Sequence, residues 1–177
     1  MLRNYQKYAI DLLYQWFRDN PSGNPILELP TGSGKSWIVA QLCRDALDNW
    51  PETRVLMLTH QKELIEQNAE KLRLVWPDAP MGIYSAGLKQ RDIDAITFAG
   101  IQSVRDRAPD LGHIDLVVID ECHLINNARQ GGYRKLLGAL AEINPHLRVI
   151  GLTATPYRLG QGYLTEGKDA LFHDILH

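Results

Sequence analysis

The chain has 177 residues, 45% of them hydrophobic, and carries a formal net charge of -2 at pH 7. A chain of this length that folds as one domain buries about 70% of its unfolded surface, so a single core can hold it together. The nearly balanced charge argues against a protein that is basic over its whole surface. Any contact with nucleic acid is therefore expected from a local patch.

Two cysteines, Cys43 and Cys122, lie far apart in the chain and form neither a metal-ligand pattern nor a disulfide framework, which is typical of a reducing compartment. The first ten residues are polar and aromatic, unlike a signal peptide. No apolar run reaches the roughly 18 residues that a membrane span requires. The sequence predicts a cytoplasmic protein that does not contact a membrane.

The elements expected along the chain alternate between helices and strands. Apolar residues recur at helical spacing from Tyr5 to Phe17, which predicts a first helix that ends at the turn residues 20–23. The series continues, in chain order, with strand 26–29, helix 38–47, strand 55–58, helix 64–75, strands 96–98 and 116–119, helix 133–140 and strand 149–152. Between residues 76 and 94 the pattern places boundaries only to within about four residues.

This order predicts an α/β fold, with a mostly parallel sheet that helices cover on both faces. The run at 116–119 is wholly apolar, as in a strand that is covered on both faces. In such a sheet, ligands gather at the carboxyl ends of the strands. Because the chain shows no repeat, low-complexity segment or linker, we expect one domain over residues 1–177.

The segment ELPTGSGKS, residues 28–36, joins an expected strand to an expected helix. Gly32 and Gly34 permit a backbone that turns its N–H groups towards a polyphosphate, and the helix dipole adds positive charge. Lys35 can reach the β- and γ-phosphates, and Ser36 can ligate Mg²⁺. The alternative is an ordinary turn in which Lys35 faces solvent. The segment predicts a nucleoside triphosphate site.

Two carboxylates, Asp120 and Glu121, follow the buried strand 116–119 directly. Asp120 is placed to hold Mg²⁺ through water, and Glu121 to orient and deprotonate the water that attacks the γ-phosphate. The alternatives are an acidic pair that caps a helix and a metal site shared with His123. The occurrence of this pair together with the glycine loop favours ATP binding and hydrolysis.

These motifs together resemble the first RecA-like domain of superfamily 2 helicases and translocases, along nearly the whole chain. Residues 30–36 match motif I, in which leucine at the position of Leu29 is a familiar variant of the strict glycine pattern. Residues 120–123 match motif II in its DECH form. The resemblance implies ATP and Mg²⁺ as cofactors. It implies that the nucleotide phosphates contact Thr31, Gly32, Ser33, Gly34, Lys35 and Ser36.

Two other segments of this resemblance concern the base and the coupling of sites. LRNYQ, residues 2–6, resembles the adenine-recognition element, which implies that Gln6 hydrogen-bonds the adenine edge and Arg3 stacks on the base. GLTATPYR resembles motif III. It implies that Thr153 and Thr155, with His123 of motif II, couple the nucleotide state to the nucleic-acid site, although either threonine by itself is equally well read as a cap after a strand.

Two segments resemble the nucleic-acid motifs of the superfamily. LTHQKEL, residues 58–64, lies where motif Ia is found and offers Thr59, His60 and Gln61. FAGIQSV, residues 98–104, offers Gln102 and Ser103. Helix capping is the alternative for both. Because contacts to phosphate and sugar carry no sequence information, the resemblance predicts sequence-independent binding.

The segments SAGLKQR, NPHLRVIGLTATPYRLGQG and ALFHDIL resemble the RadD-type bacterial proteins linked to DNA repair, which favours DNA over RNA. Family members carry a second RecA-like domain that supplies the arginine finger. We expect this chain to be the first lobe, without the second, of a larger monomeric protein. Two alternatives stay open. One is an ATP-switched nucleic-acid binding module, and the other is a P-loop kinase, which the DECH and TATP pair disfavours.

Overall fold

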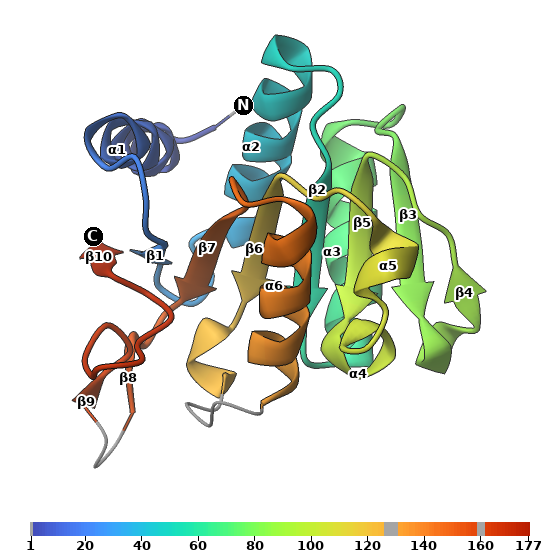
Figure 1. Ribbon diagram of the computed structural model, residues 1–177. Coiled ribbons are helices and arrows are strands. Elements are labelled where there is room, and N and C mark those ends of the chain that lie inside the picture. The colour runs from blue at the N-terminus through green and yellow to red at the C-terminus, as the bar shows by residue number, and fades with distance from the viewer. Residues whose placement is uncertain (1, 126–130, 159–161) are drawn as a thin grey trace.

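The computed structural model describes residues 2–125, 131–158 and 162–177. These residues form an eight-stranded sheet in the order β10-β1-β7-β6-β2-β5-β3-β4 (Figure 1). Its strands are β1 (Pro25–Glu28), β2 (Val55–Thr59), β3 (Met81–Ser85), β4 (Gln90–Arg91), β5 (Ile96–Gly100), β6 (Leu116–Asp120), β7 (Arg148–Thr153) and β10 (Asp174–Leu176). All neighbours pair in parallel except β3 and β4. The predicted α/β fold with a mostly parallel sheet is confirmed.

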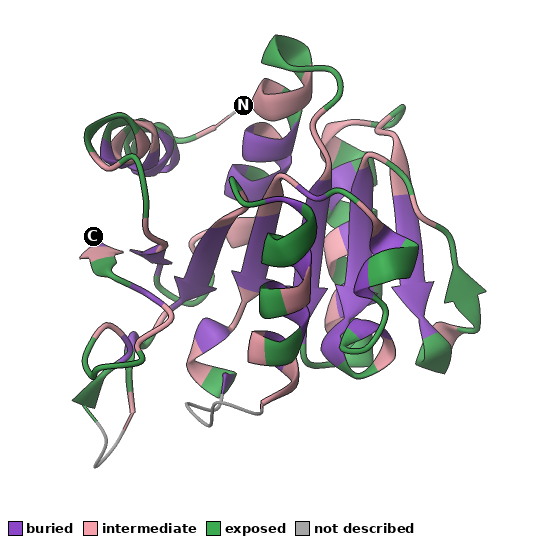
Figure 2. Cartoon of the chain, viewed as in Figure 1, coloured by how far each residue is buried: buried purple, intermediate pink, exposed green. Residues whose placement is uncertain are grey.

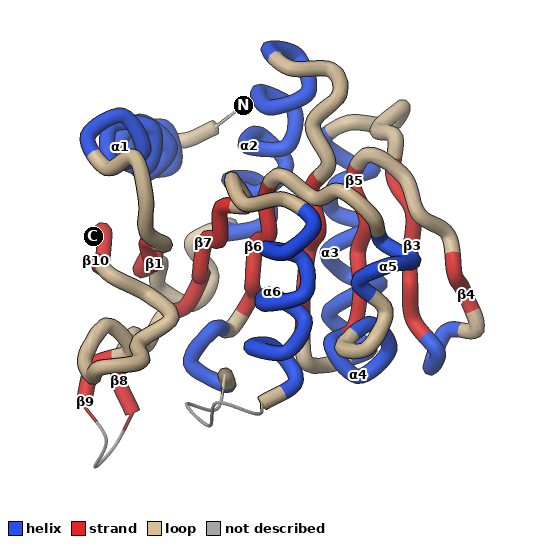
Figure 3. Tube along the Cα trace, in the orientation of Figure 1, coloured by secondary structure: helices blue, strands red, loops and turns tan. Residues whose placement is uncertain are grey.

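Helices cover both faces of this sheet, as Figures 1 and 3 show. They are α1 (Asn4–Asp19), α2 (Lys35–Asn49), α3 (Lys62–Val75), α4 (Ile101–Val104), α5 (Ala108–Leu111) and α6 (Gly132–Ile143), with the 3₁₀ turns η1 (Ala86–Leu88) and η2 (Cys122–Leu124). The strands β8 (Tyr157–Arg158) and β9 (Gly162–Tyr163) form a separate antiparallel ribbon. Over the described ranges, none of these helices has the length and apolar character to cross a membrane.

Two apolar cores lie on either side of the sheet, because successive strand residues point to opposite faces. In β2, Val55 and Met57 belong to the core formed with α1, α2 and α3, whereas Leu56 and Leu58 belong to the core formed with α4, α5 and α6. The strands β2 and β5 are buried along their whole length (Figure 2). This two-sided burial explains why these strands read as continuous apolar runs.

The structure differs from the sequence-based expectation at the two edges of the sheet. β3 and β4 lie in the region where the pattern left the boundaries loose. β10 pairs with β1, although the series was expected to close at residue 152. Because β10 is short and carries the exposed Asp174, it has no apolar run that a pattern could detect.

The parallel arrangement brings the loops that follow five strands to one edge of the sheet. In sheet order β1, β7, β6, β2 and β5, these strands end at residues 28, 153, 120, 59 and 100. The glycine loop, the acidic pair and motif III therefore follow three adjacent strands. The two segments that resemble nucleic-acid motifs follow the next two.

Candidate nucleotide-binding site

The glycine loop wraps around the amino end of α2. Gly32 and Gly34 have φ angles of 79° and 76°, in the left-handed region that glycine adopts without steric cost. The Ser33 N–H donates to the Pro30 carbonyl at 3.1 Å. Within the described chain, the N–H groups of residues 34–36 have no hydrogen-bond partner. Free N–H groups at a helix amino end, beside the Lys35 ammonium, fit the phosphate groups of a nucleotide.

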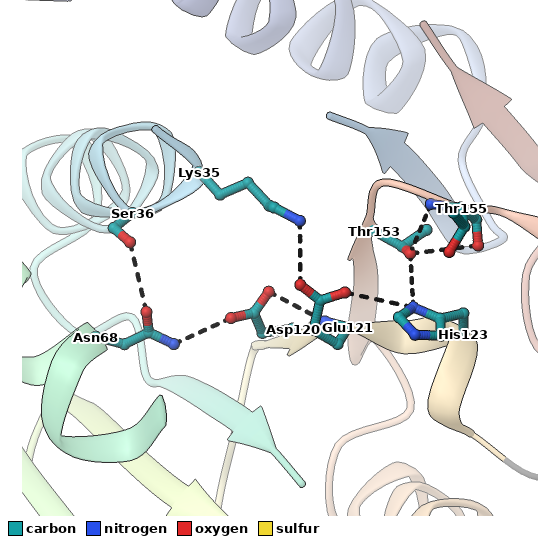
Figure 4. Close-up of polar contacts among 8 residues, drawn as sticks. All are labelled: Lys35, Ser36, Asn68, Asp120, Glu121, His123, Thr153 and Thr155. Carbon is teal, nitrogen blue, oxygen red and sulfur yellow. Dashed lines mark hydrogen bonds and ion pairs between the residues drawn. The ribbon is translucent and has the colours of Figure 1, made fainter. Parts of the chain in front are cut away.

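Lys35 and Glu121 meet across this loop. Lys35 Nζ lies 3.2 Å from Glu121 Oε1, and the two side chains are 16% and 32% exposed (Figure 4). Glu121 has a φ of 51°, which is uncommon for a residue other than glycine and is found preferentially at functional sites. Its backbone N–H donates to Asp120 Oδ1 at 3.0 Å, which orients the Asp120 carboxylate. The predicted phosphate-binding lysine and the predicted catalytic base are therefore direct partners.

Ser36 and Asp120, the residues predicted to ligate Mg²⁺, are joined by Asn68 of α3. Ser36 Oγ donates to Asn68 Oδ1 at 3.4 Å, and Asn68 Nδ2 donates to Asp120 Oδ2 at 3.1 Å. Mg²⁺ prefers such oxygen donors and usually takes only one or two protein carboxylates, with phosphate oxygens and water completing its shell. Among the described residues there is no group of three His, Cys, Asp or Glu side chains that could hold a metal ion. The site fits an Mg²⁺ ion that arrives with a nucleotide.

Asn68 was missed by the sequence reasoning. Its neighbours on the same face of α3, Ile65, Ala69 and Leu72, are buried in the core. A polar residue among buried apolar ones at helical spacing is the signal that could have identified it, because asparagine is a poor helix former. Lys35, Ser36, Asn68 and Asp120 line one small pocket.

A chain of polar contacts links the acidic pair to motif III. His123 Nδ1 lies 3.4 Å from Glu121 Oε2 and 2.8 Å from Thr153 Oγ1 (Figure 4). The Thr153 hydroxyl also accepts the Thr155 N–H at 3.0 Å. Arg158 Nε donates to the His123 carbonyl at 3.0 Å, and burial of this guanidinium lowers its pKa. Arg158 is thus tied to motif II.

The predicted adenine-recognition residues border the glycine loop. The Gln6 side chain is buried, where Oε1 accepts the Arg3 N–H at 2.9 Å and Nε2 donates to the Ser33 carbonyl at 3.0 Å. Beside it lies a hollow of about 320 Å³. The hollow is lined by Arg3, Tyr5, Gln6, Gly32, Ser33, Gly34 and Trp37. Trp37, which the sequence reasoning did not single out, is half-exposed and offers a flat ring to a base.

The residues predicted to contact nucleic acid separate into exposed and buried ones. His60 and Gln102 come from different strand ends and line one hollow with Arg105 and Tyr133, and the rings of His60 and Tyr133 stack with centroids 6.5 Å apart. Thr59, by contrast, is only 3% exposed.

The backbone near Thr59, Gln61 and Ser103, which belong to the same predicted set, is held by hydrogen bonds to the Thr59 and Ser103 hydroxyls. The Thr59 hydroxyl accepts the N–H of the exposed Gln61 at 3.5 Å, so its burial favours a role in shaping the turn. The Ser103 hydroxyl accepts the Ala86 N–H at 2.9 Å. Contacts of these residues with a nucleic-acid strand stay predictions.

The chain has relatives in both sequence and structure. Residues 1–158 match the family described as type III restriction enzyme, res subunit. The chain is 27% identical over 98% of its length to the putative ATP-dependent helicase IRC3 of Saccharomyces cerevisiae, and 29% identical over 90% of its length to the ATP-dependent RNA helicase DHX58 of Mus musculus. It covers 26% of each relative, so it spans about a quarter of the length of these proteins.

Two solved structures share the fold. The UvsW helicase from bacteriophage T4 aligns with a TM-score of 0.73 at 23% identity, over 98% of this chain and 59% of the other. The Sulfolobus solfataricus SWI2/SNF2 ATPase core, solved in complex with double-stranded DNA, aligns with a TM-score of 0.68 at 19% identity, over 97% of this chain and 34% of the other. The family match and these folds agree with the site geometry. The chain belongs to the family of the type III restriction enzyme res subunit, and it has the RecA-like fold of the first domain of superfamily 2 helicases.

Proposed function

We propose that this chain is the ATP-binding lobe of an ATP-dependent DNA helicase or translocase, which hydrolyses ATP to move along nucleic acid when a second RecA-like lobe is joined to it. One observation carries the proposal. Lys35, Ser36 and the carboxylates of residues 120–121 converge on free N–H groups at one edge of the sheet. Positioning and charge stabilisation are what phosphoryl transfer requires of a protein.

Each of these residues has a defined task. Lys35 and the N–H groups of residues 34–36 hold the phosphate oxygens. Ser36 and Asp120 hold Mg²⁺, which when bound neutralises charge on the β- and γ-phosphates. Glu121 orients a water molecule and accepts its proton. Lys35 Nζ lies 3.2 Å from Glu121 Oε1, so a bound phosphate would compete with this carboxylate for the ammonium.

The proposed polymer track uses the exposed and partly exposed side chains at the ends of β2 and β5. His60 and Gln61 would contact phosphates at one strand end, and Gln102 and Ser103 at the other. The resemblance to RadD-type proteins favours DNA as the polymer. A cytoplasmic location, which the two isolated cysteines favour, and a monomeric full-length protein are further parts of the proposal. The second lobe would supply the arginine that meets the charge of the transferred phosphoryl group.

The experiment measures nucleotide binding and phosphate release by the purified chain, with and without single-stranded DNA. Because an arginine finger contributes about 10³ to 10⁵ in rate, we expect weak Mg²⁺-dependent binding of ATP and ADP and hydrolysis little above background. The variant Lys35→Ala, which lacks the ammonium, controls for contaminating ATPases.

Failure of the folded chain to bind either nucleotide would refute the proposal. Robust DNA-stimulated turnover that disappears in Lys35→Ala would instead show that one lobe is catalytically complete, and the second-lobe part would be wrong. In a protein with both lobes, binding without any turnover would favour the ATP-switched binding module.

A further inference from the structure

Asn68 occupies a position that none of the motifs accounts for. Its amide lies between the Ser36 hydroxyl on α2 and the Asp120 carboxylate at the end of β6, at 3.4 and 3.1 Å (Figure 4). These two partners are the residues predicted to ligate Mg²⁺. A residue from a third element, α3, therefore connects the two halves of the metal site.

The chemistry of the amide suits this bridge. An asparagine side chain offers an oxygen acceptor and N–H donors at once, so it can accept from a hydroxyl and donate to a carboxylate. Because the Ser36 hydroxyl donates its proton to Asn68, its lone pairs stay free to face a cation. Within the described residues, Asp120 Oδ2 accepts one hydrogen bond, which is fewer than a carboxylate oxygen can accept. Asn68 thus orients both oxygens without using their capacity for a metal.

The position of Asn68 on α3 connects this site to the proposed nucleic-acid loop. α3 begins at Lys62, directly after the loop residues 59–61, and a rise of about 1.5 Å per residue places Asn68 about 9 Å further along the same helix. Buried contacts of Ile65 and Leu72 fasten the helix to the core. A packed helix moves as a unit, so a shift of its amino end reaches the amide.

We infer that Asn68 is a positioning residue, which holds Ser36 and Asp120 in place for Mg²⁺ and reports the state of the nucleic-acid loop to them through α3. The inference rests on the proposed function, since it takes the site to bind Mg²⁺ with a nucleotide. Hydrogen bonds that orient metal ligands are typically worth 10- to 100-fold in metal affinity. A purely structural asparagine at the contact of α2 and α3 would affect stability but not the requirement for Mg²⁺.

The test compares ADP affinity of the chain in EDTA and across a Mg²⁺ titration, with Mn²⁺ binding followed by electron paramagnetic resonance as a readout that is independent of activity. For Asn68→Ala we expect unchanged ADP affinity in EDTA, and at least about tenfold more Mg²⁺ or Mn²⁺ for half-saturation. Asn68→Gln keeps the amide but displaces it by one methylene, so it should show the same defect. Because glutamine is a good helix former, this variant should not weaken α3. Gln67→Ala, at an exposed neighbour on α3, is the matched control and should leave the titration unchanged.

A second arm measures how single-stranded DNA shifts the affinity for Mg²⁺ and ADP, because coupling between two sites is reciprocal. Both Asn68 variants should reduce the DNA-induced shift in ADP affinity, measured at saturating Mg²⁺. Gln67→Ala should preserve this shift. If the metal concentration for half-saturation in both Asn68 variants lay within twofold of that of the unsubstituted chain, the inference would be overturned. The proposed function would still stand in that case if Lys35→Ala lost nucleotide binding. Absence of any Mg²⁺ effect on nucleotide binding by the parent chain would overturn both.

Discussion

Replacement of Glu121 by glutamine should strengthen ATP binding, although it removes the proposed catalytic base. Lys35 Nζ lies 3.2 Å from Glu121 Oε1, and both side chains are partly exposed. To contact a phosphate, the ammonium has to leave this partner. The ion pair therefore competes with the nucleotide for the same positive charge.

The size of the effect follows from the exposure of the pair. Ion pairs with this degree of solvent access are worth about 0.5 to 1 kcal/mol, so Glu121→Gln should raise ATP affinity about two- to fivefold. Lys35→Ala should act in the opposite direction. It removes a charge-assisted hydrogen bond of about 1.5 to 3 kcal/mol, so nucleotide affinity should fall at least about tenfold. In the double variant the gain from Glu121→Gln should disappear, because no ammonium is left to release.

Isothermal titration calorimetry with a non-hydrolysable ATP analogue and Mg²⁺ measures all four corners of this cycle. In a protein with both lobes, the same Glu121→Gln change should lower hydrolysis by roughly a hundredfold or more, because the general base is lost. Equal or weaker ATP binding by Glu121→Gln, or strictly additive effects in the double variant, would refute the competition for Lys35. Equal turnover in variant and parent would exclude Glu121 as the base.

Thr153→Val removes the hydroxyl that contacts His123, so we expect ATP affinity within about twofold of the parent but weaker DNA stimulation in a protein with both lobes, measured by phosphate release. Gly151→Ala should lower the free energy of unfolding by about 1 to 3 kcal/mol in urea titrations, because its Cβ would lie 2.7 Å from the Phe172 ring. Burial raises the pKa of the Cys43 thiol to about 12, so a maleimide at pH 8 should label this residue only after unfolding, which mass spectrometry detects.

The central part of the fold could be predicted because its signals are local. The run at 116–119 is covered on both faces of the sheet, so its residues in the sequence are all apolar. The glycine loop could also be predicted from the sequence, since positive φ angles at Gly32 and Gly34 favour a residue without a side chain. The family match over residues 1–158 then confirms the helicase-type domain to which these motifs pointed.

The features that the sequence did not reveal depend on partners far along the chain. Asn68 acquires its contacts from α2 and β6, so its own neighbours in sequence say only that it faces inward. Trp37 reads as an ordinary helix residue until α1 closes the hollow beside it. The short strand β10 is held by pairing with β1 and by the bond from Trp16 Nε1 to Asp174. None of these depends on a repeating pattern.

The sheet order gives the acidic pair its central place in the proposed coupling. β6 lies between β7 and β2, so the carboxylates at its end stand between motif III and the nucleic-acid loop. The strands themselves are locked by hydrogen bonds and two-sided burial, and one strand cannot shift without its neighbours. In the proposed coupling, a change at the γ-phosphate would therefore pass through side chains at the edge of the sheet. One path runs from Glu121 through His123 to Thr153, and the other from Asp120 through Asn68 to α3.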